Sequence, residues 1–302
     1  MNSDGPKDEA EISNSARVTT SLLAGAMAGG LAKTVIAPLD RTKINFQIKR
    51  MPFSFREARN FIVNSYKSSG LISLWRGNSA TLARVLPYAA IQYTSHEQFK
   101  SLLDVETNDQ KRKHPARSFV AGSLAGVVST SCTYPLDLAR ARMAVTHREM
   151  YNSLLAVFYK TVHDEGYKAL FRGYLPTLLG VIPYAGTSFF TYETLKRCHY
   201  EHHGPLDPNP LERLVFGAIA GLLGQSASYP LDIVRRRMQT QTKARTIAQI
   251  LCKLRREEGI IHGLYKGLSM NWIKGPIAVG VSFTTFDLIS GFLRELPFFK
   301  DL

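Results

Sequence analysis

The chain has 302 residues and carries 38 Lys and Arg against 24 Asp and Glu, which gives a net charge of +14 at pH 7. This basic balance predicts an anionic partner, such as nucleic acid, an anionic lipid surface or a small anion. The three cysteines lie far apart without CxxC spacing, so they provide neither a disulfide framework nor a zinc site.

Residues 1–18 are predicted to form a polar N-terminal tail. The tail is acidic and matches neither a secretory signal nor an Arg-rich mitochondrial presequence. Any targeting information is therefore expected to lie inside the chain.

Six windows of 18 to 20 residues follow the tail, and each is long enough for a helix to cross a bilayer. Three of them contain no Asp, Glu, Lys or Arg, and the other three contain one basic residue each. The windows are 20–39 with Lys33, 77–95 with Arg84, 118–136, 173–192, 214–231 and 267–286 with Lys274. The mean hydropathy of the whole chain is only −0.10, so the average alone does not indicate a membrane protein.

The windows belong to a threefold tandem repeat. Small-xxx-small patches begin at Gly25, Gly122 and Gly217, and a proline follows each patch 13 residues after its first glycine. A second phrase, an aromatic then a basic residue then glycine, ends at positions 77, 173 and 267. Three phrases in register at a spacing of about 95 residues predict three repeats, at 19–105, 115–200 and 210–296.

The loop inside each repeat is basic and contains a short amphipathic stretch, which predicts a surface helix around residues 55–62, 154–161 and 247–254. These loops (40–76, 137–172 and 232–266) hold 23 basic and 9 acidic residues. The positive-inside rule places all three on the inner side, and the even number of spans places both termini on the opposite side.

Three basic residues inside the windows indicate a binding site. A charge in the middle of a span is costly, and no acidic residue lies in the windows that contain Lys33, Arg84 and Lys274. These side chains either extend to an interface or line a water-filled cavity built for an anion. The central positions of Arg84 and Lys274 favour the cavity.

Two sets of opposite charges suggest gates at the ends of this cavity. Each repeat proline is followed by an acid and a base three residues apart, which pair either on one helix or between repeats if the helix ends converge. The pairs are Asp40/Lys43, Asp137/Arg140 and Asp232/Arg235. A second set follows the even spans: Glu97/Lys100, Glu193/Lys196 and Asp287/Ser290. Two rings of charge that close in turn would provide alternating access.

The tripled pattern Pro-x-Asp-x-x-Lys/Arg with a later aromatic-basic-Gly resembles the mitochondrial carrier family over nearly the whole chain. The resemblance implies an all-α inner-membrane protein, a pseudo-threefold barrel of six transmembrane helices with short matrix helices. It implies matrix pairs Asp40–Arg140, Asp137–Arg235 and Asp232–Lys43, and cytoplasmic pairs Glu97–Lys196 and Asp287–Lys100. This chain departs from the pattern at Ser69, His96 and Ser290, so Glu193 should lack a partner.

The same resemblance implies the substrate contacts. They lie seven residues after each aromatic-basic-Gly glycine, at Arg84, Gly180 and Lys274, and two of these are the charges found above. In family members that carry adenine nucleotides, Gly180 and Val181 would form a slot for adenine, beside Tyr184, with Lys33 as a further phosphate contact. Ordinary helix packing is the alternative for Gly180, Val181 and Tyr184.

Segments such as PLDLARARMAVT and GLYKGLSMNWIKGPIAVG are similar to the members that carry coenzyme A. That similarity implies coenzyme A import in exchange for adenine nucleotides or adenosine 3',5'-diphosphate. The carrier is expected to be a monomer with no cofactor or metal. It is expected to contact the bilayer, with anionic lipid at the matrix face. An ADP/ATP or ATP-Mg/phosphate exchanger is the alternative substrate class. The P-loop and GxGxxG motifs of soluble nucleotide enzymes are absent from the sequence. A nucleic-acid binder would not alternate basic loops with apolar spans. His199, His202 and His203 could hold a metal, but an exposed polar linker is the favoured interpretation.

Overall fold

The computed structural model describes residues 14–48, 53–107, 110, 114–146, 150–204, 206–242 and 245–295. Among these residues it contains helices and no β-strand. The elements are α1 (Asn14–Ile48), α2 (Phe55–Ser69), η1 (Leu71–Trp75), α3 (Asn78–Leu102), α5 (Pro115–Val145), α6 (Leu154–Glu165), η2 (Tyr167–Phe171), α7 (Tyr174–His203), α8 (Pro210–Thr240), α9 (Ile247–Glu258), α10 (Ile260–Leu264) and α11 (Leu268–Glu295).

The six predicted windows coincide, to within a residue, with parts of six long helices: α1, α3, α5, α7, α8 and α11. Four stretches are long and apolar enough to cross a membrane, namely Thr20–Ile48, Ala116–Val145, Pro210–Thr240 and Ile260–Arg294. The other two helices, α3 and α7, are less apolar. In α3 the cause is a polar composition that includes Arg84 near the middle of the helix.

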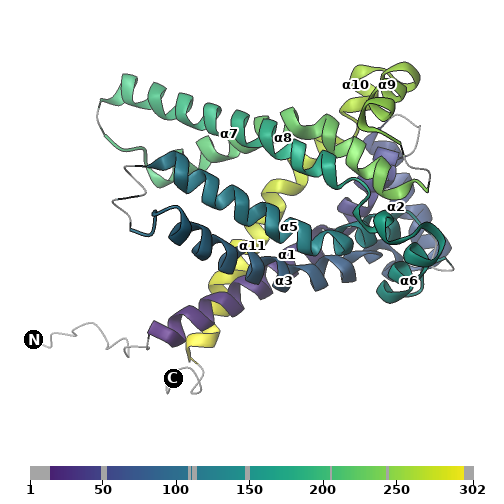
Figure 1. The fold of residues 1–302 in the computed structure, drawn as a ribbon, viewed down its shortest axis with the longest axis horizontal. Coiled ribbons are helices and arrows are strands. Elements are labelled where there is room, and N and C mark those ends of the chain that lie inside the picture. The colour runs from purple at the N-terminus through teal and green to yellow at the C-terminus, as the bar shows by residue number, and fades with distance from the viewer. Residues whose placement is uncertain are drawn as a thin grey trace, which may run out of the picture. The chain divides into compact units, whose positions relative to one another are not determined.

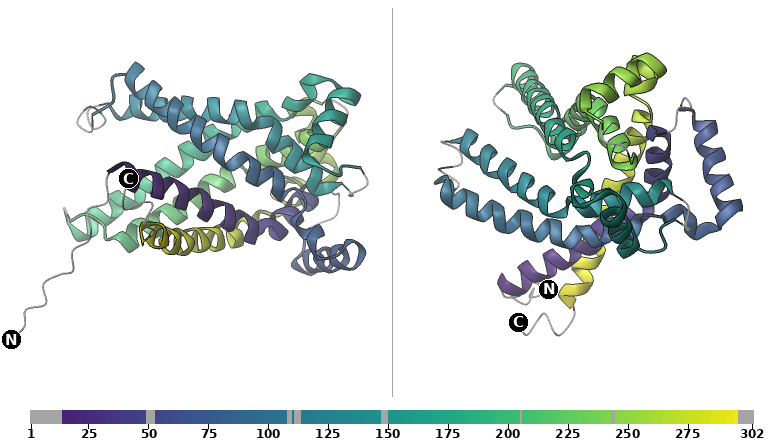
Figure 2. Two further views of the ribbon diagram at one scale, coloured as in Figure 1. Left: turned by 90° about the horizontal axis from the view of Figure 1, so that it is seen from below. Right: turned by 45° about the vertical axis from the view of Figure 1, so that its right-hand side comes forward.

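The helices fall into two compact units. One comprises the described residues of 1–36 and 274–302, and the other comprises the described residues of 37–273. In the larger unit α3 packs along α5 and α7 packs along α8, as Figures 1 and 2 show. In the smaller unit α1 comes close to α11, because a Cβ on Gly25 would lie 4.0 Å from the Phe286 ring.

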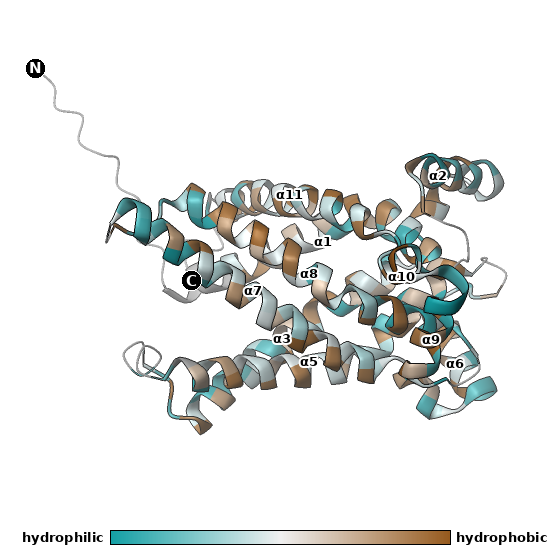
Figure 3. Ribbon diagram, turned by 90° about the horizontal axis from the view of Figure 1, so that it is seen from above, coloured by the Kyte–Doolittle hydropathy of each residue, from teal (hydrophilic) through white to brown (hydrophobic). Residues whose placement is uncertain are grey.

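Large apolar side chains are exposed along the long helices. Among them, Leu86 is 65% exposed, Phe190 is 72% exposed and Leu288 is 70% exposed. Figure 3 shows hydrophobic residues along the middle of these helices, whereas α6 and α9 carry both hydrophobic and hydrophilic ones. A helix satisfies its own backbone hydrogen bonds, so such surfaces suit a hydrocarbon environment.

The three predicted loop helices are present as α2, α6 and α9. Each begins at a side-chain N-cap, in which Ser54, Ser153 and Thr246 accept hydrogen bonds from backbone N–H groups of the first turn. A short turn follows each of them. It is a 3₁₀-helix in the first two repeats and an α-helical turn, α10, in the third. The third repeat has one more residue in this turn, which the wider helix accommodates.

The glycine that ends each aromatic-basic-Gly phrase is required by its backbone and by close packing. Gly77 and Gly173 have φ values of 89° and 83°, a left-handed conformation that glycine adopts without steric cost. A Cβ on either would lie 3.0 Å from a backbone carbonyl of the next odd helix, Arg140 in α5 or Arg235 in α8. These glycines therefore bring the start of α3 against α5 and the start of α7 against α8.

Candidate functional site

The ends of α1, α5 and α8, just after their internal prolines, meet in the larger unit. We call the contact between the end of α1 and α5 the first junction, and the contact between α5 and α8 the second junction. Arg140 forms an ion pair with Asp40 across the first junction. Arg235 donates to Asp137 at 2.6 Å across the second. Two of the three inter-repeat pairs implied by the family pattern are thus present, and their role as a gate is a proposal.

The predicted third pair, Lys43 with Asp232, stays a prediction. Lys43 is buried, and its ammonium group lies 5.1 Å from the centre of the Tyr229 ring. This contact already joins the end of α1 to α8.

A set of side chain to backbone hydrogen bonds closes the three helix ends into a ring. In each repeat, the side chain of the residue seven positions after the proline donates to a backbone carbonyl of the next repeat. That carbonyl belongs to the residue nine positions after the proline of the next repeat. The bonds are Asn45 to Ala144 at 2.9 Å, Arg142 to Gln239 at 3.1 Å and Arg237 to Gln47 at 3.0 Å. Because the third repeat donates back to the first, the convergence that inter-repeat pairing requires is confirmed at this end of the helices.

Two glutamines brace the ring. The amide of Gln239 donates to the Tyr134 hydroxyl at 3.1 Å, and the amide of Gln47 donates to the Tyr229 hydroxyl at 3.3 Å. Each tyrosine precedes a repeat proline and donates to the carbonyl of the basic residue before the repeat's second glycine. The equivalent positions for the first junction are occupied by two alanines, Ala37 and Ala144. The sequence analysis did not predict these braces. The signal was that the two positions, taken from neighbouring repeats, are Tyr and Gln at two junctions and Ala and Ala at the third.

A buried carboxylate clamps each of the last two repeats. Glu165 accepts both Arg142 guanidinium nitrogens at 2.6 and 2.9 Å and is also paired with Arg172. Glu258 accepts Arg237 at 2.5 Å and is also paired with Lys266. Each clamp ties the end of an odd helix to the following loop helix and to the start of the next even helix.

Glu258 lies in α9, outside the spanning helices, and its ionisation is tied to this clamp. Burial alone would raise the pKa of its carboxyl group, but the hydrogen bonds and charges of Lys266 and Arg237 outweigh burial and lower that pKa. Glu258 is therefore held as a carboxylate, which is the form that the clamp needs.

The first repeat has no such clamp, because Asn45 and Ser69 replace the arginine and the glutamate. A cavity of about 310 Å³ lies there, and Asn45, Ser65 and Ser68 are among its lining residues. Arg76 donates instead to the carbonyls of Met143 and Tyr151 in the second repeat, at 2.9 and 3.1 Å.

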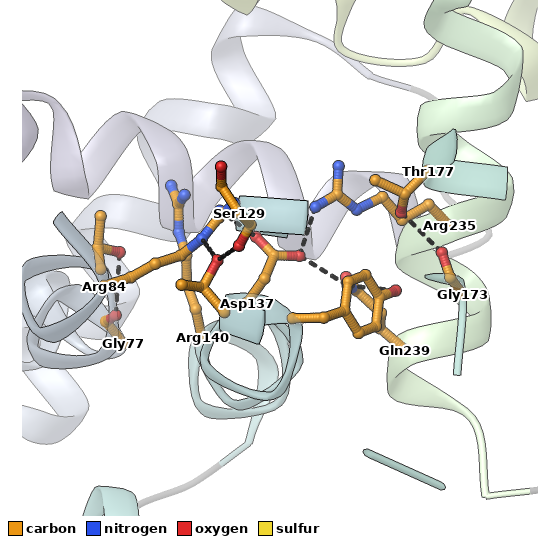
Figure 4. A network of polar contacts seen from close by, with 12 residues as sticks. Gly77, Arg84, Ser129, Asp137, Arg140, Gly173, Thr177, Arg235 and Gln239 are labelled. Carbon is orange, nitrogen blue, oxygen red and sulfur yellow. Dashed lines mark hydrogen bonds and ion pairs between the residues drawn. The ribbon is translucent and has the colours of Figure 1, made fainter. Parts of the chain in front are cut away.

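Arg84 has an acidic partner outside the six windows. Its Nη1 lies 3.3 Å from Asp137 Oδ1, and its Nε donates to Thr133 Oγ1 at 3.1 Å. Figure 4 shows Arg84 and Arg235 reaching Asp137 from opposite sides. The partner was missed because Asp137 lies one residue beyond the 118–136 window, on a different helix from Arg84.

The predicted adenine slot corresponds to a cavity. Gly180, Val181 and Tyr184 share a space of about 230 Å³ between α7 and α8, with Thr177, Gln225, Ser228, Asp232 and Arg235. Val181 and Tyr184 are 47% and 44% exposed, so they are not simply buried between helices. The wall from α8 carries polar groups and the two opposite charges of Asp232 and Arg235, and the wall from α7 mixes polar, small and apolar groups.

Lys33 in α1 and Lys274 in α11 belong to the smaller unit. Lys33 is exposed and Lys274 is half-buried. Each already interacts with another group of the protein.

At the other ends of the even helices, Lys100, Lys196 and Ser290 make contacts within their own helices. Lys100 lies 2.5 Å from Glu97 of its own helix, and the Lys196 ammonium lies 5.7 Å from the Tyr200 ring. Ser290 is buried and donates to the backbone carbonyl of Asp287. The predicted pairs Glu97–Lys196 and Asp287–Lys100, and the lack of a partner for Glu193, stay predictions.

The histidine cluster provides helix contacts. His199 stacks on His203 with ring centres 4.6 Å apart, and its Nδ1 lies 3.7 Å from a Glu212 carboxylate oxygen in α8. Within the described part of the chain, no group of three His, Cys, Asp or Glu side chains is placed to hold a metal ion.

Comparison with known proteins decides the family. The model of the family described as "Mitochondrial carrier protein" matches residues 14–106, 111–203 and 207–296. The chain belongs to the mitochondrial carrier family. It is therefore a multi-pass mitochondrial membrane transporter rather than an enzyme, and its all-α fold of three tandem repeats is the one that the sequence predicts.

Individual relatives are similar along nearly their whole length. Mitochondrial coenzyme A transporter SLC25A42 of Homo sapiens is 57% identical over 286 residues, which cover 93% of this chain and 90% of the relative. The protein of the same name from Xenopus tropicalis is 55% identical over 305 residues, covering 99% and 91%. Solute carrier family 25 member 16 of Homo sapiens is 36% identical, covering 91% and 88%.

Proposed function

We propose that this carrier imports coenzyme A into the mitochondrial matrix. The observation that carries the proposal is the identity of 55 to 57% over nearly the whole chain with relatives that are named coenzyme A transporters. The chemistry agrees with it, because coenzyme A combines an adenine ring with three phosphate groups. Phosphates form strong charge-assisted hydrogen bonds with basic side chains.

We assign Arg84, Lys274 and Lys33 to the phosphates and the cavity at Gly180, Val181 and Tyr184 to the adenine ring. The counter-substrate is an adenine nucleotide or adenosine 3',5'-diphosphate, because each shares adenine and phosphate with coenzyme A. Exchange takes place by alternating access across the inner membrane. The ring at the ends of α1, α5 and α8 is the matrix gate.

The orientation follows from charge. The three basic loops lie in the matrix, in contact with anionic lipid, and both termini lie in the intermembrane space. The second gate is formed at the opposite ends of the even helices by Glu97, Lys100, Glu193, Lys196 and Asp287. The carrier works as a monomer.

Reconstitution in liposomes tests this function. We expect uptake of labelled coenzyme A that depends on internal adenosine 3',5'-diphosphate or ADP and that external coenzyme A competes best. Uptake of ADP or ATP that coenzyme A does not inhibit would instead identify the carrier as an ADP/ATP or ATP-Mg/phosphate exchanger. Empty liposomes measure background leakage.

The adenine slot has its own pair of variants. A Cβ at Gly180 would lie 3.8 Å from the Leu231 Cβ, an ordinary contact, so Gly180→Ala should retain uptake. Gly180→Leu fills the cavity and should abolish uptake while the protein still inserts. Equal uptake by both variants would place adenine elsewhere.

A further inference from the structure

The cavity between α7 and α8 contains a glutamine whose amide group has no partner in the described part of the chain. Gln225 of α8 lines this cavity opposite Gly180, Val181 and Tyr184 of α7. It is half-buried, and among the described residues its side chain makes no hydrogen bond. A polar side chain in a spanning helix that faces a cavity instead of a protein partner is a candidate contact for a ligand.

Close packing beside Gln225 fixes the spacing of the two cavity walls. A Cβ on Gly224 would lie 2.8 Å from the Tyr184 backbone carbonyl and 1.9 Å from the Ser188 hydroxyl oxygen, so glycine allows this approach. The Ser188 hydroxyl also donates to the Ala220 carbonyl of α8 at 3.1 Å. Because Gln225 follows Gly224 directly, its amide and the Tyr184 side chain extend into the cavity from neighbouring points on opposite walls.

The other polar side chains of the cavity are committed or offer one kind of bond. Thr177 and Ser228 donate to backbone carbonyls three or four residues earlier, at 2.7 and 3.2 Å, so their hydroxyls retain only the capacity to accept. Arg235 can only donate, and the Asp232 carboxylate can only accept. Among the described lining residues, Gln225 is therefore the one that offers a donor and an acceptor on two separate atoms.

We propose that Gln225 reads the edge of the adenine ring and gives the carrier a preference for this base. Adenine presents its 6-amino donor beside a ring nitrogen that accepts, and a glutamine amide matches this pair with two hydrogen bonds. The amide oxygen of Gln225 accepts from the amino group, and its NH₂ group donates to the ring nitrogen. This role deepens the proposed function and rests on it, since it needs the base in this cavity.

The contact makes binding depend on the 6-amino group. A base with hydrogen in place of that group leaves the Gln225 amide oxygen without its donor. Losing a neutral hydrogen bond of this kind lowers affinity about threefold to tenfold. If Gln225 were only solvated in the cavity, replacing it would change the affinity for both bases alike.

The first test measures binding to the full-length unchanged protein in detergent. The probes are coenzyme A and adenosine 3',5'-diphosphate, each compared with an analogue that has hydrogen in place of the 6-amino group. We expect the amino form of at least one pair to bind about threefold to tenfold more tightly. Equal binding within both pairs overturns the proposal, and this result needs no variant to fold.

The second test repeats the comparison with Gln225→Leu, a change of similar size that an apolar spanning helix tolerates well. This variant should bind the two members of each pair equally. Ser226→Ala is the matched control, because the Ser226 hydroxyl donates to the Leu222 carbonyl at 2.7 Å and does not line the cavity. The control should keep the preference. A preference that survives in Gln225→Leu means that another group, such as Asp232, reads the base, and it overturns the proposal.

The two probe pairs separate base reading from coenzyme A transport. If only the adenosine 3',5'-diphosphate pair binds and its preference depends on Gln225, the coenzyme A function fails and base reading stands. If coenzyme A binds and is transported but the preference is absent or survives in Gln225→Leu, the function stands and base reading fails. Binding of neither pair contradicts both.

Discussion

The first and second junctions occupy equivalent places in the repeat and are built differently. At the second junction, a buried carboxylate collects four donors, a Tyr134–Gln239 brace lies beside it, and the Glu165 clamp supports the end of α5. At the first, the Asp40–Arg140 pair lies beside two alanines, and Asn45 and Ser69 stand where the clamp would be. The threefold repeat therefore fixes where the helices meet and leaves the strength of each contact to individual residues.

The difference suggests an order of opening. Hydrogen bonds to charged groups contribute about 1.5–3 kcal/mol each, and neutral ones about 1 kcal/mol. Among the described contacts, the second junction has more bonds to charged groups, whereas each junction has one neutral bond. We therefore expect the first junction to separate more readily when the matrix gate opens.

The largest expected effect is loss of the Asp137 carboxylate. Asp137→Asn removes the buried negative charge that Arg235 and Arg236 contact, and breaking a buried charge pair costs about 3–5 kcal/mol. Asp40→Asn is the matched change at the first junction and should cost less. Melting temperatures of the two purified variants measure this. A larger loss for Asp40→Asn would reverse the ranking of the junctions.

The resemblance to the carrier family implied the pairs Asp40–Arg140 and Asp137–Arg235, whereas the recurring motif alone left pairing within one helix open. The sequence itself predicted every long helix, since apolar windows of bilayer length are unambiguous. It did not predict the contact between Arg84 and Asp137. That contact depends on the height and rotation of α3 relative to α5, which the pattern of either helix alone does not determine.

The braces are a different case. Tyr in one repeat is matched by Gln in the next at two junctions, and alanine occupies both positions at the third, so the information was present in the sequence. It became readable only when the structure showed which repeat donates to which. Covariation of this kind between neighbouring repeats would have identified Gln47 and Gln239.

A clamp added to the first repeat should give a smaller effect, and in the stabilising direction. Asn45→Arg with Ser69→Glu recreates the arrangement of Arg142 with Glu165, and the cavity beside Asn45 has room for the larger side chain. We expect a gain of about 1 kcal/mol, or about 2–4 °C in melting temperature, and slower exchange. The single variant Asn45→Arg is the control and should destabilise, because it adds a cation near Arg41 and Arg76. A double variant no more stable than that control would show that the repeats are not interchangeable here.

The smallest effect concerns pH. The pKa of Glu258 is lowered in the folded protein, so its clamp stabilises fully above the ordinary glutamate value of about 4.3. That stabilisation is lost as the pH falls through the lowered, folded-state pKa. The difference in melting temperature between the unchanged protein and Glu258→Gln should therefore be constant near neutral pH and shrink below about pH 4. A difference that grows on acidification would mean that Glu258 is protonated in the folded state.

The central claim is that ion pairs between repeats form a gate that must close during transport. Coenzyme A uptake into liposomes by a charge-swapped pair tests it most directly. The first junction is the better place, because at position 137 an introduced arginine would face Arg84 and Arg236. Asp40→Arg and Arg140→Asp should each lose most of their uptake, and the double variant should recover several-fold over either one. A folded, inserted double variant that transports no better than the worse single variant would contradict the account.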